Sequence, residues 1–177
     1  MSDVIKSLEY QLESHQRPKS DLSVQQPGLF VPGLRQQPWW DTSEFQWVKT
    51  IEDVFPEIYR EYRVLDKKHP NLWQEYTEPQ VTPTFGLTAQ PLHDAGNWDV
   101  IYLTLLNRRF DDVHQRCPVT SQVLEAIPAE TMVKFSRLAP HSHIPAHCGP
   151  TNLFLRCHLG LDIPDSCGMR VDSEVRT

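Results

Sequence analysis

The residues with the clearest potential for chemistry lie between His147 and Leu161. A histidine in a Gly-Pro turn is followed there by a run in which apolar side chains alternate with others. If residues 153–161 form a strand, Arg156 and His158 lie on one face, opposite a continuous apolar row. A guanidinium beside an imidazole, just after another histidine, suits an anionic ligand held next to a metal ion. The pattern by itself also describes the solvent face of an antiparallel strand, which is the commoner situation.

A second histidine pattern lies just upstream of this segment. His141 and His143 are followed by His147, as in the His-x-His clusters of cupin-type metal sites. Alternate residues of a strand share a face, so this arrangement is also able to bind a metal. Pro140 and Pro145 bracket the pair, however, and proline is rare inside strands. We therefore expect loop positions for His141 and His143, and a cupin-like metal enzyme using the three histidines remains an alternative.

The segment from His147 to Leu161 also resembles a motif of the aspartyl/asparaginyl β-hydroxylase family of iron(II)- and 2-oxoglutarate-dependent oxygenases. Three flanking motifs follow the family order and extend the resemblance over roughly residues 32–177. They are Pro32-Gly33-Leu34-Arg35 with Pro38-Trp39-Trp40, then Gly96-Asn97-Trp98, then Ile163-Pro164 with Cys167, Arg170-Val171, Glu174 and Arg176. A long central motif with three ordered companions is far more specific than one short pattern.

The resemblance implies four residues that bind 2-oxoglutarate. Arg156 and His158 would hold the carboxylate nearest the metal, and Ser136 would bond the far carboxylate. Trp98 would line the pocket, although a core tryptophan has the same appearance in a sequence. Arginine suits its role because its planar fork pairs with a carboxylate and does not lose its charge.

The resemblance also implies the metal site. His147 would be the first iron(II) ligand, and Gly149 stands where many related oxygenases have a carboxylate, in agreement with a family that uses two histidines. The family's second histidine, and a second arginine for the far carboxylate, are expected beyond Thr177. We therefore expect a domain truncated before its closing strands, whose 177 residues are inactive alone.

The activity implied by the resemblance is hydroxylation, with dioxygen, of the β-carbon of Asp or Asn residues or of a related substrate. No catalytic residue is implied beyond the ligands of the metal and the co-substrate. Phe154 stands where better-known members carry an arginine that contacts an acidic substrate, which favours a different or less charged peptide, amino-acid or acyl substrate. A truncated, non-catalytic family member acting as a binding module is the second hypothesis.

Composition limits the class of protein. The chain has 177 residues and a formal net charge of −6, which disfavours nucleic acid and anionic membranes as partners. It contains no apolar run long enough to span a membrane and no apolar signal core near its start, so a cytoplasmic location is expected. The four cysteines lack zinc-site spacing and are expected to be reduced.

The expected architecture is mainly β with flanking N-terminal helices. A short helix over residues 3–14 and a polar arm would form an N-terminal segment, residues 1–31, ahead of a domain over residues 32–177. Periodicity predicts helices from Asp41 to Phe55, from Pro56 to Leu65, and over residues 120–126 with Thr120 as N-cap. Strands are predicted over residues 98–106, 131–138, 153–161 and 168–174. Helices followed by antiparallel strands suggest a jelly roll, which the resemblance sharpens to a cupin-like double-stranded β-helix.

Overall fold

A computed structural model describes residues 31–81, 87–91, 96–128, 131–147, 149 and 151–177. The predicted helix over residues 3–14 lies outside these. The chain divides into two compact units. We call residues 41–145 the central unit, and residues 1–40 with 146–177 the flanking unit. Each is described by itself.

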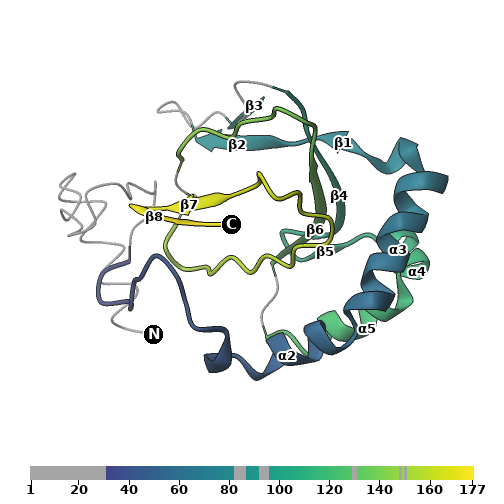
Figure 1. Ribbon diagram of the computed structural model, residues 1–177, viewed down its shortest axis with the longest axis horizontal. Helices are drawn as coiled ribbons and strands as arrows, with labels where there is room; N and C mark the ends of the chain where they lie inside the picture. Colours follow the sequence, from purple (N-terminus) through teal and green to yellow (C-terminus); the bar gives the residue numbers. More distant parts are fainter. Residues whose placement is uncertain (1–30, 82–86, 92–95, 129–130, 148, 150) are drawn as a thin grey trace. The chain divides into compact units, whose positions relative to one another are not determined.

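The central unit begins with helices (Figure 1). The Asp41 carboxylate accepts a hydrogen bond from the Ser43 N–H at 2.9 Å and so caps the first turn. Pro56 lies in the first turn of the longest helix, where its missing N–H has no cost, and His69 ends that helix. Both helices predicted here are confirmed. The elements are η1 (Thr42–Glu44), α2 (Gln46–Asp53), α3 (Phe55–Lys68) and η2 (Pro70–Leu72).

An antiparallel sheet is built around one long strand, which begins at Trp98 as predicted. This strand, β4 (Trp98–Leu105), pairs along its whole length with β6 (Met132–Leu138), which confirms both predictions. On its other edge β4 pairs with two short strands, β1 (Gln74–Glu75) and β5 (Arg108–Arg109). A separate hairpin joins β2 (Thr77–Val81) to β3 (Leu87–Pro91).

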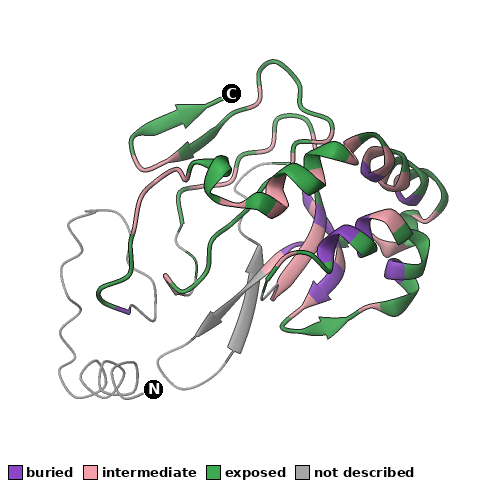
Figure 2. Cartoon of the chain, turned by 90° about the horizontal axis from the view of Figure 1, so that it is seen from below, coloured by how far each residue is buried: buried purple, intermediate pink, exposed green. Residues whose placement is uncertain are grey.

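The core of the central unit lies between one face of this sheet and the helices. Ile101, Leu103 and Phe135 are buried in the sheet, and the Tyr62 ring of α3 lies 5.8 Å from the Phe135 ring. Figure 2 shows buried residues on β4 and on the helices α4 (Asp111–Arg116) and α5 (Pro118–Leu124). Arg137 of β6 bonds both Asp66 of α3 and Asp99 of β4, which ties helix to sheet.

Helix α5 begins two residues earlier than predicted, and the expectation of Thr120 as its N-cap is wrong. Pro118 occupies the first turn, and the Glu61 carboxylate of α3 accepts hydrogen bonds from the N–H groups of Val119 and Thr120 at 2.8 and 2.9 Å. An acidic side chain from a distant helix therefore satisfies the donors that a local cap otherwise serves.

The flanking unit has little regular structure among its described residues. Its strands are β7 (Met169–Val171) and β8 (Glu174–Arg176), which form a hairpin. The single strand predicted over residues 168–174 therefore corresponds to β7, the turn and the first residue of β8. The strand predicted over residues 153–161 is wrong: residues 154–160 belong to no helix or strand. A strand needs a neighbouring strand to pair its backbone N–H and C=O groups, and none of the sheets formed by the described residues includes this run.

The fold class is therefore mixed. The described residues combine helices with antiparallel sheets and form no closed barrel. Their share of β-structure is lower than the mainly β prediction. The jelly roll stays a prediction. No helix among the described residues has both the length and the apolar character needed to cross a membrane.

Candidate functional site

The face of the sheet opposite the helices carries two of the predicted site residues. Register pairs Trp98 with Leu138, Val100 with Ser136 and Tyr102 with Lys134. Paired and alternate residues share a face, whereas Ile101 and Phe135 point to the core side. Trp98 and Ser136, 38 positions apart in sequence, therefore lie on one surface, which we call the aromatic face.

Trp98 and Ser136 are in direct contact. The indole Nε1–H of Trp98 donates a hydrogen bond of 2.8 Å to the Ser136 hydroxyl. The Tyr76 ring lies 3.9 Å from the Trp98 ring, and Tyr76, Trp98 and Val100 form a buried cluster. Ser136 itself is exposed. Because its oxygen accepts from the indole, its own hydrogen is available to an acceptor such as a carboxylate.

Lys134 is a residue of this face that the sequence interpretation missed. Its ammonium lies 3.6 Å from the centre of the Tyr76 ring and 5.1 Å from that of Trp98. Tyr102 contributes a third ring, at 6.0 Å. The signal was present in the sequence, since Lys134 precedes Ser136 by two positions in a predicted strand and must share its face.

The start of β4 is held in place by a backbone clamp around Gly96. Gly96 has a φ of +73°, and a Cβ added to it would lie 2.8 Å from the Cα of Ser142. The Asn97 N–H donates to the Ser142 hydroxyl at 3.0 Å, and that hydroxyl donates back to the Asn97 carbonyl at 3.1 Å. The Gly-Asn-Trp motif therefore fixes the position of Trp98, because only glycine allows this close approach.

The three other predicted site residues belong to the flanking unit. His147, Arg156 and His158 are all exposed and lie outside helices and strands. The described residues contain no group of three His, Cys, Asp or Glu side chains able to hold a metal ion. His141 lies in a turn with a φ of +61°, and His143 likewise lies in no helix or longer strand, as predicted.

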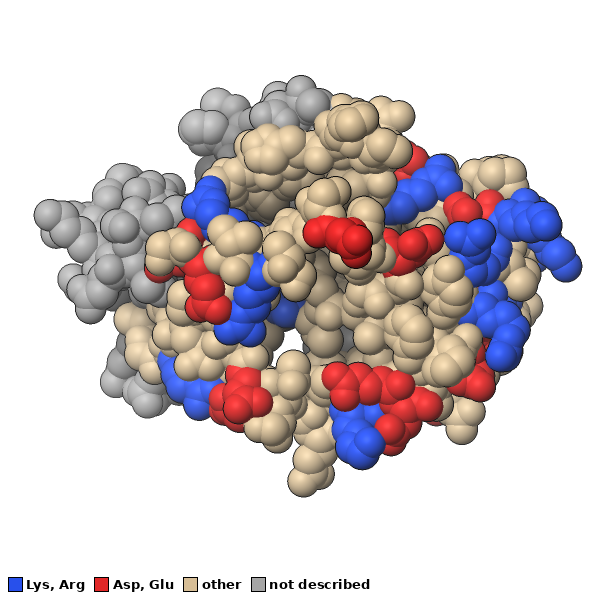
Figure 3. Space-filling model, viewed as in Figure 1, with Lys and Arg blue, Asp and Glu red and all other residues tan. Residues whose placement is uncertain are grey.

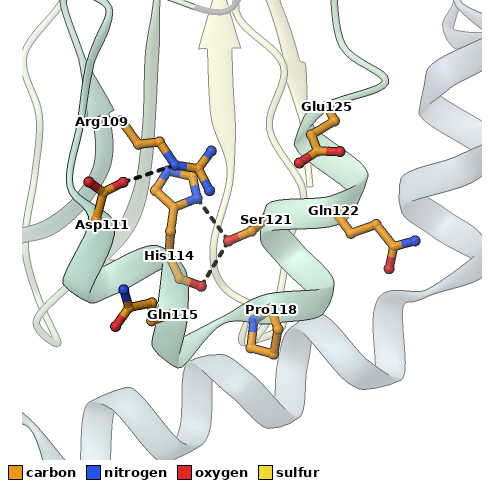
Figure 4. A pocket seen from close by; sticks show the side chains of 8 residues that line it. All are labelled: Arg109, Asp111, His114, Gln115, Pro118, Ser121, Gln122 and Glu125. Carbon is orange, nitrogen blue, oxygen red and sulfur yellow. Dashed lines mark hydrogen bonds and ion pairs between the residues drawn. The ribbon is translucent and has the colours of Figure 1, made fainter.

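A hollow of about 390 Å³ lies at α4 and α5 in the central unit (Figure 4). His114, only 3% exposed, lines it, and its Nδ1 lies 2.8 Å from the Ser121 hydroxyl. Its Nε2 is buried with no hydrogen-bond partner among the described residues. Burial first, and the nearby positive charge of Arg109 second, lower the pKa of His114, against weaker effects of the Leu103 carbonyl and Asp111. The neutral imidazole is therefore the stable form here.

Cys117 and Cys167 are free thiols, and Cys148 lies outside the described residues. Cys117 is fully buried, and this burial raises the pKa of its thiol to about 12. A thiol that stays protonated is a poor nucleophile and a poor metal ligand. Cys117 is therefore a core residue.

Charges of both signs lie side by side over the helices on the face drawn in Figure 3. Helix α3 shows the mixture, with Glu57 in its first turn and Lys67 and Lys68 in its last. This arrangement suits the helix dipole, which favours acidic residues at the start and basic residues at the end. We attribute these charges to helix stability and solubility.

Comparison with known proteins gives a consistent result. The family profile described as aspartyl/asparaginyl beta-hydroxylase matches residues 52–177. The human protein named aspartyl/asparaginyl beta-hydroxylase is 32% identical over 165 residues, which are 88% of this chain and 20% of the human one. The ornithine lipid ester-linked acyl 2-hydroxylase of Rhizobium tropici is 30% identical over 148 residues, 80% of this chain and 49% of that protein.

A third relative has a more general name. Human aspartate beta-hydroxylase domain-containing protein 1 is 30% identical over 167 residues, 86% of this chain and 38% of its own length. The chain thus spans between about a fifth and a half of the length of these relatives. Two of the three names specify a hydroxylation, one at an amino-acid residue and one at an acyl chain.

Proposed function

Because this chain belongs to the aspartyl/asparaginyl beta-hydroxylase family, we propose that it is the co-substrate-binding part of an iron(II)- and 2-oxoglutarate-dependent hydroxylase. The observation that carries the proposal is the hydrogen-bonded pair of Trp98 and Ser136 on the aromatic face. In such a reaction a C–H bond, dioxygen and 2-oxoglutarate give an alcohol, succinate and carbon dioxide. The protein's part is to bind and orient these reactants.

The aromatic face fits one end of the co-substrate. Ser136 has a hydroxyl hydrogen to donate to a carboxylate, and the indole bond from Trp98 fixes the position of its oxygen. The Trp98 ring that donates this bond is itself buried in a cluster with Tyr76 and Val100, which excludes water from the indole side of the bond. A dicarboxylate would therefore be held by its far end on a rigid strand, which suits precise positioning.

The metal part of the proposal rests on the resemblance and on His147. An exposed imidazole is able to ligate iron(II), and the described residues supply no cluster of three ligands. Iron(II), when bound, would supply the activation of dioxygen. Arg156 and His158, as exposed cationic and imidazole side chains, are assigned by resemblance to the carboxylate nearest the metal.

The substrate is proposed as the β-carbon of an aspartyl or asparaginyl residue, or the corresponding carbon of an acyl chain. The names of the human and Rhizobium relatives supply these two classes. Phe154 is half-exposed in the flanking unit and offers an apolar surface in place of a cation. An apolar side chain at this position favours a less charged substrate.

The test is a turnover assay on the chain with iron(II), ascorbate and 2-oxoglutarate, in which succinate is counted against hydroxylated product. An aspartyl peptide, an asparaginyl peptide and an ornithine-type acyl lipid are compared. We expect Ser136→Ala to raise the dissociation constant of the chain for 2-oxoglutarate about tenfold, because one hydrogen bond to a charged group is lost. Ser173→Ala, in the turn between β7 and β8, is the matched control.

A non-catalytic binding module is the second candidate. Among the described residues, His147 alone matches a metal-ligating histidine that the resemblance implies, which favours it. It predicts that 2-oxoglutarate binds with no succinate formed above the iron-only background, and that His147→Ala changes nothing. Succinate production that depends on His147 and on substrate would exclude the module and support the enzyme.

A further inference from the structure

We propose that the hollow at α4 and α5 binds a small amino alcohol, whose hydroxyl donates a hydrogen bond to His114 and whose ammonium pairs with Glu125. The hollow of about 390 Å³ lies in the size range of small-molecule sites. None of its lining residues takes part in the proposed function, so the inference does not depend on that function. It rests on one buried ring nitrogen and on the charges that surround the hollow.

The contacts of Ser121 determine which nitrogen of His114 carries the hydrogen. The Ser121 hydroxyl oxygen lies 2.7 Å from the Cys117 carbonyl oxygen and 3.0 Å from that of His114. Two oxygens approach to 2.7 Å when a hydrogen lies between them, so the hydroxyl donates its single hydrogen to a carbonyl. It must then accept a hydrogen bond from Nδ1 of His114, which is 2.8 Å away. We therefore assign the hydrogen of the neutral ring to Nδ1 and a lone pair to Nε2.

Nε2 of His114 is thus a hydrogen-bond acceptor that the described residues leave without a donor. His114 is 3% exposed, and its Nε2 is buried with no hydrogen-bond partner among the described residues. The Leu103 carbonyl weakly raises the pKa of the ring, but it is itself an acceptor and receives the Phe110 N–H at 2.9 Å. A buried acceptor without a donor is unfavourable, so a ligand that supplies the donor relieves this cost.

The neighbouring charge of Arg109 favours a neutral donor at this nitrogen. In Figure 4 the Arg109 guanidinium lies over the imidazole, and burial first and this positive charge second lower the pKa of the ring. The same repulsion acts on an ammonium, so a hydroxyl is the better donor here. Arg109 pairs with Asp111 at 3.2 Å through side chains that are 48% and 77% exposed. Because such an exposed ion pair contributes little, the arginine side chain is free to move aside and admit a ligand.

The other side of the hollow favours a cation. Figure 4 shows Gln122 and Glu125, at the end of α5, across the hollow from His114. The Glu125 carboxylate makes no ion pair within the described part of the chain. The lining residues carry two carboxylates and one guanidinium, so their net charge is negative and disfavours anions. A short chain with a hydroxyl at one end and an ammonium at the other therefore matches both sides.

The experiment is a titration of the full chain with 4-amino-1-butanol, followed by the Nε2 resonance of His114 in a nitrogen–proton NMR spectrum. This resonance reports whether the nitrogen is protonated and whether it accepts a hydrogen bond. Two matched compounds each lack one group: 1-amino-4-methoxybutane has no hydroxyl hydrogen, and 1-pentanol has no ammonium. We expect saturable binding of the amino alcohol and a dissociation constant at least about fivefold higher for each of the other two.

Variants of the chain test the two sides of the hollow separately. Glu125→Gln should raise the dissociation constant of 4-amino-1-butanol about threefold or more, because the charge that pairs with the ammonium is lost. Glu52→Gln removes the same charge from an exposed position of α2 and should leave binding unchanged. Ser121→Ala should also weaken binding, because Nδ1 loses the acceptor that keeps the hydrogen there and Nε2 becomes protonated in part of the molecules.

The inference is overturned if 4-amino-1-butanol does not change the His114 resonance, or if the methoxy compound or 1-pentanol binds as tightly. Equal weakening by Glu125→Gln and Glu52→Gln would also overturn it, as would a hydrogen found on Nε2 in the free chain. Stronger binding of acetate than of the amino alcohol at this resonance would overturn it and assign the hollow to anions.

Discussion

The central and flanking units differ in how their apolar residues are used. In the central unit, apolar side chains from β4, β6 and three helices are buried between sheet and helices. In the flanking unit, Val31 is the buried residue among those described, and Leu153, Phe154, Leu155, Ile163, Met169 and Val175 are exposed. Both units contain runs of alternating apolar residues, so the pattern alone does not produce a core.

This difference shows that a segment forms a strand only when a second segment pairs with it. Residues 98–105 and 132–138 are rich in residue types that favour strands, and the two segments pair with each other at seven positions. Residues 153–161 alternate as regularly but belong to none of the sheets among the described residues, and they stay irregular. Alternation determines which side chains share a face once a ladder exists, whereas the ladder itself requires a neighbour.

The largest expected effect compares one leucine from each unit. Leu103 is 0% exposed in β4, and Leu155 is 54% exposed in the flanking unit. Leu103→Ala should lower the free energy of unfolding by about 2–5 kcal/mol, because it removes buried apolar contacts and leaves a cavity. Leu155→Ala should change it by less than about 0.5 kcal/mol. Urea unfolding followed by tryptophan fluorescence measures both, and equal losses would show that the flanking unit shares the core's cooperativity.

A second comparison uses two glycines with positive φ. Gly96→Ala should destabilise the central unit by about 2–4 kcal/mol, because the new Cβ meets Ser142 and a positive φ disfavours alanine. Gly33→Ala shares the unfavourable φ but has no atoms within 4 Å of the new Cβ, and should cost only the backbone strain of about 1–2 kcal/mol. The Trp98 indole resonance should shift in the first variant alone; a similar shift in both would refute the clamp.

Much of the central unit was predictable, and the reasons are local. Asp41, Pro56 and His69 mark helix boundaries through caps and proline geometry, which a sequence displays directly. The Glu61 carboxylate that starts α5 was not predictable, because its partners are 58 and 59 positions away. Helix α4 was missed for a similar reason, since its six residues pack by contacts with β4 and α5 that no short-range pattern encodes.

The sequence likewise predicted some residues of the candidate site and missed others. Resemblance assigned Trp98 and Ser136 to the co-substrate pocket, and the structure joins them by a hydrogen bond. Their role stays a prediction. Lys134 shares a strand face with Ser136 by spacing, but its contacts with the rings of Tyr76 and Trp98 were missed because those rings lie in other segments. The roles of His147, Arg156 and His158 stay predictions, since they depend on the ligands these exposed residues bind.

A pH dependence of the free energy of unfolding is expected from His114 in the central unit. The pKa of His114 is lowered in the folded state, so folding favours the neutral ring. The unfolded chain then binds more protons below its own pKa of about 6.5, and stability is lost as the pH falls from there toward the folded pKa. His114→Asn should flatten this loss, measured as the urea midpoint between pH 5 and 8. A pH dependence that persists unchanged in His114→Asn would contradict its assignment to this residue.

The smallest expected effect compares the two tight turns. Leu105 pairs with Arg108, so Leu106 and Asn107 form a two-residue turn between β4 and β5 in which both φ values are positive. Such a type I′ turn suits Asn or Gly, and Leu106 is a poor fit that is also 77% exposed. Leu106→Asn should therefore raise the free energy of unfolding by about 0.5–1 kcal/mol, through relief of backbone strain.

Asp172, with a φ of +54°, occupies the turn between β7 and β8 and provides the counterpart in the flanking unit. Asp172→Gly relieves the same kind of strain, but its hairpin has no buried residues among those described. A two-stranded ribbon without an apolar face contributes little to global stability. We expect the urea midpoint to move in Leu106→Asn and to stay in place in Asp172→Gly. An equal increase in both variants would mean that the β7–β8 hairpin unfolds together with the central core, and that exposure of its side chains does not set its stability.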